Sequence, residues 1–180
     1  MIRKFFKIVI AVLLLFILLV GYFEYFGLTT TKFNSIIKEQ VKKQSVDLDI
    51  DIKKVKLHLD LKNLSIKIKT KNPKLILNNS KDIKINEISS NISISSYFQN
   101  KFAIKNLLIN SKNNKISSYI DLYRYFNNSI QLVILKQVFK KGDAQININI
   151  NFDNDGKIKD NFKVSGKFFN TELRIPNNKN

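Results

Sequence analysis

The chain has 180 residues, and its 31 Lys and Arg outnumber its 14 Asp and Glu, so the formal net charge is +17 at pH 7. It contains no Cys, which excludes a disulfide framework and means that thiols carry no information about the compartment. Lys, Asn and Ile are frequent while Gly, Pro, Ala and Arg are scarce, a composition typical of an AT-rich genome. We therefore interpret most of the Lys residues as solvated surface.

The first 26 residues predict a membrane anchor. An uncharged apolar run from Ile8 to Phe23 follows the basic residues Arg3, Lys4 and Lys7. At about 1.5 Å per residue this run spans roughly 24 Å, and the segment 5–26 spans roughly 33 Å, enough to cross a bilayer core. The aromatic residues that close the run suit the membrane interface.

The alternative to an anchor is a cleaved signal peptide, which has the same basic start. Cleavage needs small residues at the cut, but Gly21 has Leu19 two positions before it and Gly27 has Tyr25. We therefore expect the helix to be retained. The basic N-terminal segment is very short, so the positive-inside rule places it in the cytoplasm and residues 27–180 outside.

Residues 27–180 have the length of one domain. Removing Arg3, Lys4, Lys7 and Glu24 from the totals leaves 28 basic and 13 acidic residues in this part, a net charge of +15. A functional interpretation of this charge is an anionic partner such as lipid headgroups, lipopolysaccharide or nucleic acid. Nucleic acid is disfavoured because the basic residues do not cluster with exposed aromatic residues.

A short amphipathic helix is predicted from about Lys32 to Gln44, with an N-cap in Thr29-Thr30-Thr31. From Val46 the apolar period becomes two, which is typical of strands with one apolar and one polar face. The phase slips at Lys53-Lys54 and Lys62-Asn63, where we expect turns or bulges. The apolar strand positions are Val46, Leu48, Ile50, Ile52, Val55, Leu57, Leu59, Leu61, Leu64, Ile66, Ile68, Leu75, Leu77, Ile83, Ile85, Ile92, Ile94, Phe102, Ile104, Leu107 and Ile109.

Helical periodicity returns between Ile116 and Phe126. The dense apolar run from Ile130 to Lys141 fits either a second helix or a buried strand, and we favour a helix that ends near Gly142. A final hairpin is predicted from the strand Ile146 to Phe152, a turn at residues 153–156, and a return strand that includes Ile158, Phe162, Val164 and Phe168.

The sequence shows little that could support catalysis. His58, the single His, falls on the polar face of its strand, where we expect ordinary exposed surface. Asp47, Asp49 and Asp51 share one strand face but stand about 7 Å apart, so pairing with Lys56 or Lys62 opposite is favoured over a metal site. Phosphate-binding, dinucleotide-binding and nucleophile-elbow motifs are absent, so no enzyme activity and no cofactor are expected.

The order of these elements resembles the start of the AsmA-like proteins, the superfamily that includes the TamB-type envelope proteins of Gram-negative bacteria. The resemblance is carried by the basic transmembrane segment, the short helix 33–41, and the alternating segments 55–66, 72–77 and 104–109. The segment 152–166 resembles the repeat unit that builds the long body of these proteins. Members are usually several times longer, so we expect a truncated member, a fragment or one unit of an assembly.

The resemblance implies a protein of the bacterial inner membrane whose elongated periplasmic β-structure carries phospholipid in a hydrophobic groove. The expected fold is mainly β, with one transmembrane helix, a short amphipathic helix, and an antiparallel meander forming an open, groove-like sheet with one or two inserted helices. The candidate groove residues are Leu59, Leu61, Ile66, Ile68, Ile92, Ile94 and Ile148. The alternative function is a structural or protein-binding module that assists outer-membrane protein assembly without moving lipid.

Overall fold

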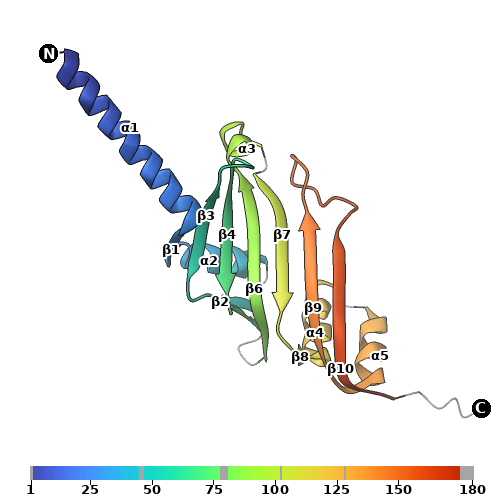
Figure 1. Ribbon diagram of the computed structural model, residues 1–180. Helices are drawn as coiled ribbons and strands as arrows, with labels where there is room; N and C mark the ends of the chain where they lie inside the picture. The colour runs from blue at the N-terminus through green and yellow to red at the C-terminus, as the bar shows by residue number, and fades with distance from the viewer. Residues whose placement is uncertain (1, 45–46, 78–80, 102, 128, 175–180) are drawn as a thin grey trace, which may run out of the picture.

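The N-terminal helix and the sheet are separate parts of the computed structural model, which describes residues 2–44, 47–77, 81–101, 103–127 and 129–174 (Figure 1). Helix α1 (Ile2–Tyr25) extends away from the rest of the chain, and its side chains from Arg3 to Leu19 are exposed. The segment Arg3–Tyr25 is long and apolar enough to cross a membrane. Such a helix cannot bury its apolar surface against itself, which is typical of a segment that lies in lipid.

An open antiparallel sheet follows α1, in the order β1-β3-β4-β6-β7-β9-β10. Strand β2 pairs with β5, β5 pairs with β6, and β8 pairs with β9. The predicted mainly β fold with an open sheet is confirmed. The strands are β1 (Leu28–Thr30), β2 (Leu48–Asp51), β3 (Val55–Asp60), β4 (Ser65–Lys71), β5 (Lys74–Leu77), β6 (Lys81–Ser93), β7 (Ile104–Ser111), β8 (Asn114–Lys115), β9 (Phe139–Asn151) and β10 (Lys163–Leu173).

Strand β6 pairs with two different strands, β5 and β4, one after the other along its length. Its residues 81–84 pair with β5, and its residues 87–93 pair with β4. A register shift in the pairing with β7 lies between Ile85 and Glu87. Such a bulge changes which alternate residues face a given side, so Ile83 and Ile85 before it share a face with Ile88 and Ile92 after it.

Helices cover one end of one sheet face, and Figure 1 shows α2 (Asn34–Gln44) and α4 (Ile116–Phe126) behind the sheet. We call this the closed end. Alternating apolar residues from the strands meet the apolar stripes of the helices there, which removes both from water. Within the described residues, the buried aliphatic side chains of the core form three clusters: Leu48, Leu77, Ile83 and Ile85; Ile116, Ile120, Leu132 and Ala144; and Ile50, Ile52 and Val55.

The opposite end of the sheet carries the short helix α3 (Ile94–Phe98), and we call it the open end. The sequence placed Ile94 in a strand, but the strand ends at Ser93, whose hydroxyl accepts a hydrogen bond from the backbone N–H of Ser96 at 3.2 Å. This is an N-cap, which starts a helix because it satisfies a backbone donor that the helix cannot pair. The prediction for Ile94 is therefore wrong.

Two other predicted boundaries also differ. Helix α5 (Ile130–Val138) ends earlier than expected, and β9 begins at Phe139. Gly142 lies inside β9 with a φ of +140°, and Ile116 and Thr171 approach it closely, so it serves a close approach and not a helix end. Of the three Thr residues before α2, Thr29 and Thr30 belong to β1, whose Leu28 and Thr30 pair with Leu57 and Val55 of β3. The predicted position Val46 and the predicted position Phe102 lie outside the described residues.

Gly27 sets the direction in which α1 leaves the sheet. Its φ is +68°, and a Cβ at this position would lie 2.5 Å from the backbone oxygen of Leu57 and 2.9 Å from the ring of His58. Only glycine tolerates both the left-handed backbone and this close approach without strain. His58 is half-buried here, not fully exposed as the sequence suggested.

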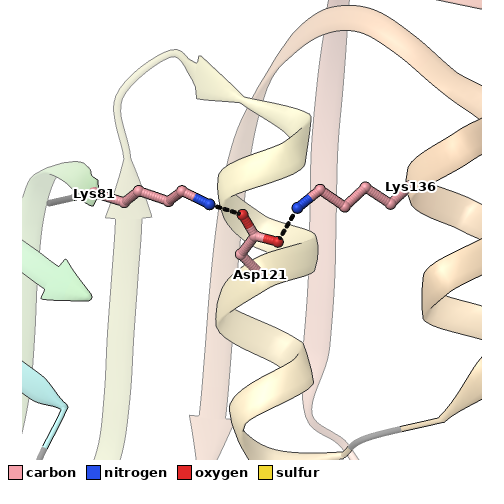
Figure 2. A network of polar contacts seen from close by, with 3 residues as sticks. All are labelled: Lys81, Asp121 and Lys136. Atoms are coloured by element: carbon pink, nitrogen blue, oxygen red, sulfur yellow. Dashed lines mark hydrogen bonds and ion pairs between the residues drawn. The ribbon is translucent and has the colours of Figure 1, made fainter. Parts of the chain in front are cut away.

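A half-buried carboxylate fastens α4 and α5 to the sheet (Figure 2). The Asp121 carboxylate of α4 accepts hydrogen bonds of 2.5 Å from Lys81, at the start of β6, and from Lys136 of α5. Burial raises the pKa of Asp121, but the hydrogen bonds and charges of the two ammonium groups outweigh burial and hold it below its ordinary value of 3.8. The charged form of Asp121 therefore stabilises the folded state.

We expect the change Gly27→Ala to destabilise the pairing of β1 with β3 by about 1 to 2 kcal/mol, because the methyl group meets the Leu57 backbone in a strained conformation. Hydrogen exchange at Leu28 and Thr30 would accelerate. Gly21→Ala is the matched control, since nothing lies within 4 Å of the Cβ that it adds. Equal exchange in both variants would contradict this role of Gly27.

We expect Asp121→Asn to lower the free energy of unfolding by about 1 to 2 kcal/mol at pH 7, because the carboxylate charge is lost and an amide NH₂ donor replaces one of the two oxygens that accept from the lysines. The folded-state pKa is depressed, so this stabilisation is complete above about pH 5 and is lost as the pH falls through the folded-state pKa. Denaturant titrations at pH 7 and pH 3 would show the difference between variant and parent shrinking. Asp82→Asn, which disrupts an exposed pair 3.9 Å from Lys74, is the control with little expected effect.

Candidate functional site

The candidate site is the apolar face of the sheet, which strand register assembles from residues far apart in sequence. Leu59 lies opposite Ile66, and Ile66 lies opposite Ile92. A second row, nearer the closed end, crosses the sheet from β3 to β9. It runs Leu57, Ile68, Ser90, Leu107 and Ile150.

A cavity of about 330 Å³ opens on this face. Its volume is near the lower end of the range of about 300 to 1,000 Å³ found for small-molecule sites. Side chains from the sheet, from α2 and from the segment after β9 surround it. They are Ile37, Ile50, Ile52, Val55, Ile68, Thr70, Ile88, Ser89, Ser90, Ile92, Ile104, Leu107 and Phe152.

Two of the hydroxyl groups in the lining are already committed to the protein backbone. Thr70 donates to the backbone oxygen of Lys54 at 3.0 Å, and Ser90 donates to that of Asn106 at 2.7 Å. Their protons are thus not offered to a ligand. Since most of the remaining lining is aliphatic, the cavity favours an occupant without polar groups, such as a hydrocarbon chain.

The cavity lies between a packed region and an uncovered one. At the closed end Ile50 and Val55 are buried, and Ile37 and Val41 of α2 pack against them. At the open end Leu59, Ile66 and Ile92 are only half-buried, and within the described part of the chain they belong to none of the three clusters. The face therefore changes from core to accessible groove along the length of its strands.

The structure places five of the seven predicted groove residues on this face: Leu59, Ile66, Ile68, Ile92 and Ile148. Ile68 and Ile92 line the cavity itself. The other two lie elsewhere, because Leu61 is in the turn between β3 and β4 and Ile94 begins α3. Leu107 and Ile37 also line the cavity, although they were not predicted as groove residues. Leu107 follows the strand alternation and could have been included. Ile37 lies on a helix, and its packing against the sheet is not visible in a local sequence pattern.

The opposite face of the sheet is polar and strongly basic near β1. A surface cavity of about 430 Å³ there is lined by Thr29, Lys53, Lys54, Lys56, Lys69 and Lys71. Lys56 and Lys69 lie directly opposite one another in the ladder, and Lys69 pairs with Glu87 at 2.5 Å. One carboxylate thus offsets part of a like-charge contact that is otherwise unfavourable.

The partners predicted for Asp49 in the acidic strand are wrong. Asp49 pairs with Lys38 at 3.0 Å and Lys42 at 3.8 Å, both on α2, because β2 pairs with β5 and does not lie beside β3. Burial raises the pKa of Asp49, but the ammonium of Lys38, the backbone N–H of Ile50 and the charge of Lys42 lower it further than burial raises it. Among the described residues, no three His, Cys, Asp or Glu side chains are grouped so that they could hold a metal ion.

The difference between the two ends of this face can be tested with one substitution at each. Val55 is 1% exposed, so Val55→Asp would bury an unpaired charge at a cost of several kcal/mol and unfold a domain of ordinary stability, about 5 to 15 kcal/mol. We expect Ile66→Asp, at the half-buried open end, to leave the fold intact. Far-ultraviolet circular dichroism and protease resistance would measure both. Unfolding of the two variants alike would mean that the open end is also core.

No protein-family model matches this chain, and comparisons with curated proteins and with solved structures likewise give no match. The resemblance to AsmA-like proteins therefore stays a prediction from the sequence.

Proposed function

We propose that the protein handles phospholipid in the cell envelope, as an AsmA-like protein anchored in the bacterial inner membrane, with the acyl chain held on the apolar face of the sheet. The observation that carries this proposal is the apolar cavity of about 330 Å³, which lies on a face that the helices cover at one end only. A volume of this size suits part of one hydrocarbon chain, while the headgroup would remain in water at the edge of the sheet.

The physical basis is the free energy of removing apolar surface from water on both partners. Each buried methylene group contributes about 0.8 kcal/mol, so a chain of eight carbons in the groove would gain about 6 kcal/mol before losses of chain entropy. Aliphatic walls also accept lipids of different chain length, because they make no directional hydrogen bonds. The groove would therefore select for hydrocarbon and not for a particular headgroup.

The proposed location follows from α1. Arg3 and Lys4 lie at the N-terminal end of α1, before its apolar run, which favours a cytoplasmic N-terminus and a periplasmic sheet. An anchor at the first strand would keep the groove close to the bilayer that supplies the lipid. A reporter fused after the C-terminal residue would then be active only if it works in the periplasm.

The second candidate function is a structural or protein-binding envelope module. It is favoured by β10, an edge strand of eleven residues with every residue exposed. An exposed strand edge offers unpaired backbone groups to which a partner strand can add. In this case the protein would bind another chain and the apolar face would not need to hold lipid.

Neighbouring leucines on β7 provide a matched test. Leu107 lines the cavity, while Leu108 pairs with Ser89 and Asn149 and alternates to the opposite face. A photocrosslinking amino acid at position 107 in the full-length protein should capture phospholipid in membranes, and the same group at position 108 should capture far less. Ile92→Asp should abolish capture at position 107, because a carboxylate beside the chain would have to lose its water.

Equal capture at positions 107 and 108, or none at either, would contradict the lipid groove. Crosslinks from β10 to another protein together with an empty groove would favour the binding module. Circular dichroism of each variant shows whether the sheet is still folded, so a loss of capture can be assigned to the groove itself.

A further inference from the structure

The open end of the sheet exposes a group of large apolar side chains to solvent. Leu61 and Leu64 are 41% and 60% exposed in the turn between β3 and β4, and Tyr97 and Phe98 are 70% and 78% exposed in α3. We call these four residues the apolar tip. Apolar residues gathered in this way mark a contact surface more often than scattered single residues do.

The tip has a defined structure, because a hydrogen bond joins its two segments and a cap fixes the start of α3. The backbone N–H of Ile94 donates to the backbone oxygen of Leu64 at 3.0 Å, which ties α3 to the β3–β4 turn. The N-cap from Ser93 to Ser96 fixes the start of α3, and Ser96 is buried. The rings of Tyr97 and Phe98 lie 5.9 Å apart, edge to face.

The backbone conformation of Leu64 is a second, independent indication that the tip contacts something other than water. Its φ is +44°, a left-handed conformation in which glycine or asparagine is usual and a branched side chain is strained. The strain places a leucine on the surface, where it gains little from the protein core. A contact outside the chain would give that exposed side chain a favourable environment.

The position of the tip indicates what that contact is. Figure 1 shows α3 at the end of the sheet toward which α1 rises, and α1 contacts β3, the strand that leads into the turn of the tip. Lys62 and Lys101 are exposed beside the apolar residues. Asp60, the acidic residue of the turn, is engaged with Asn63 through hydrogen bonds of 2.8 and 3.0 Å.

We infer that the apolar tip inserts into the boundary between headgroups and acyl chains of the same phospholipid bilayer that holds α1. This inference rests on the proposed anchoring by α1. Aromatic side chains prefer this boundary, aliphatic side chains reach below it, and Lys side chains reach up to anionic headgroups. The sheet would then touch the membrane at two places, and the open end of the groove would face lipid directly.

The chain contains no Trp, so one introduced Trp reports on one position. We would place it at Phe98 in the tip, at Leu15 in α1, and at Phe126, an exposed aromatic residue at the C-terminal end of α4. Each full-length variant is reconstituted into vesicles of phosphatidylcholine and phosphatidylglycerol, with or without bromine atoms on the acyl chains. Bromine quenches the fluorescence of a nearby Trp.

We expect bromine to quench Leu15→Trp and Phe98→Trp, with the emission of Phe98→Trp shifted to shorter wavelength, and to leave Phe126→Trp unquenched. If Leu15→Trp is quenched while Phe98→Trp behaves like Phe126→Trp, the tip inference is wrong and the anchor stands. If Leu15→Trp is not quenched, the proposed anchoring is wrong and the tip inference falls with it. Equal quenching of Phe98→Trp and Phe126→Trp would show unspecific adsorption of the domain and also overturn the inference.

Discussion

The arrangement depends on strand β6, because its backbone hydrogen bonds join the strands of the closed end of the sheet to those of the open end. Its first residues pair with β5 and its later residues with β4. The bulge after Ile85 keeps the apolar side on one face through both halves. Without that shift the isoleucines of the two halves would point to opposite sides, and the core would not continue into the groove.

The fold was largely predictable because period-two alternation is a local property of the chain. It located the strands around Leu57, Ile68 and Leu107, and helical spacing located α2 and α4. Errors occurred where a tertiary contact outweighs the local pattern. Ile94 continues the alternation but follows a Ser that caps a helix, and Phe139 continues an apolar helical run but pairs with Leu173 in the sheet.

The candidate site was only partly predictable, because alternation gives the face of a residue but not its neighbours across the sheet. Ile66 and Ile92 are far apart in sequence and adjacent only through the β4–β6 register. Asp49 was predicted to pair with the wrong lysines for the same reason. Strand β2 pairs with β5, which lies further along the chain than β3 and β4, and not with the strand that follows it. Long-range register depends on packing and turn geometry, which no short segment encodes.

The exposure of β10 makes the C-terminal side of the sheet the least stable part of the domain. This strand buries little apolar surface, so the backbone hydrogen bonds to β9 supply most of what holds it, and such a hairpin is marginal on its own. The strands near α1 are instead backed by α2 and two buried clusters. Partial unfolding would therefore start with the separation of β10 from β9 and proceed toward β3. The part of the sheet next to α1 would be the last region to unfold.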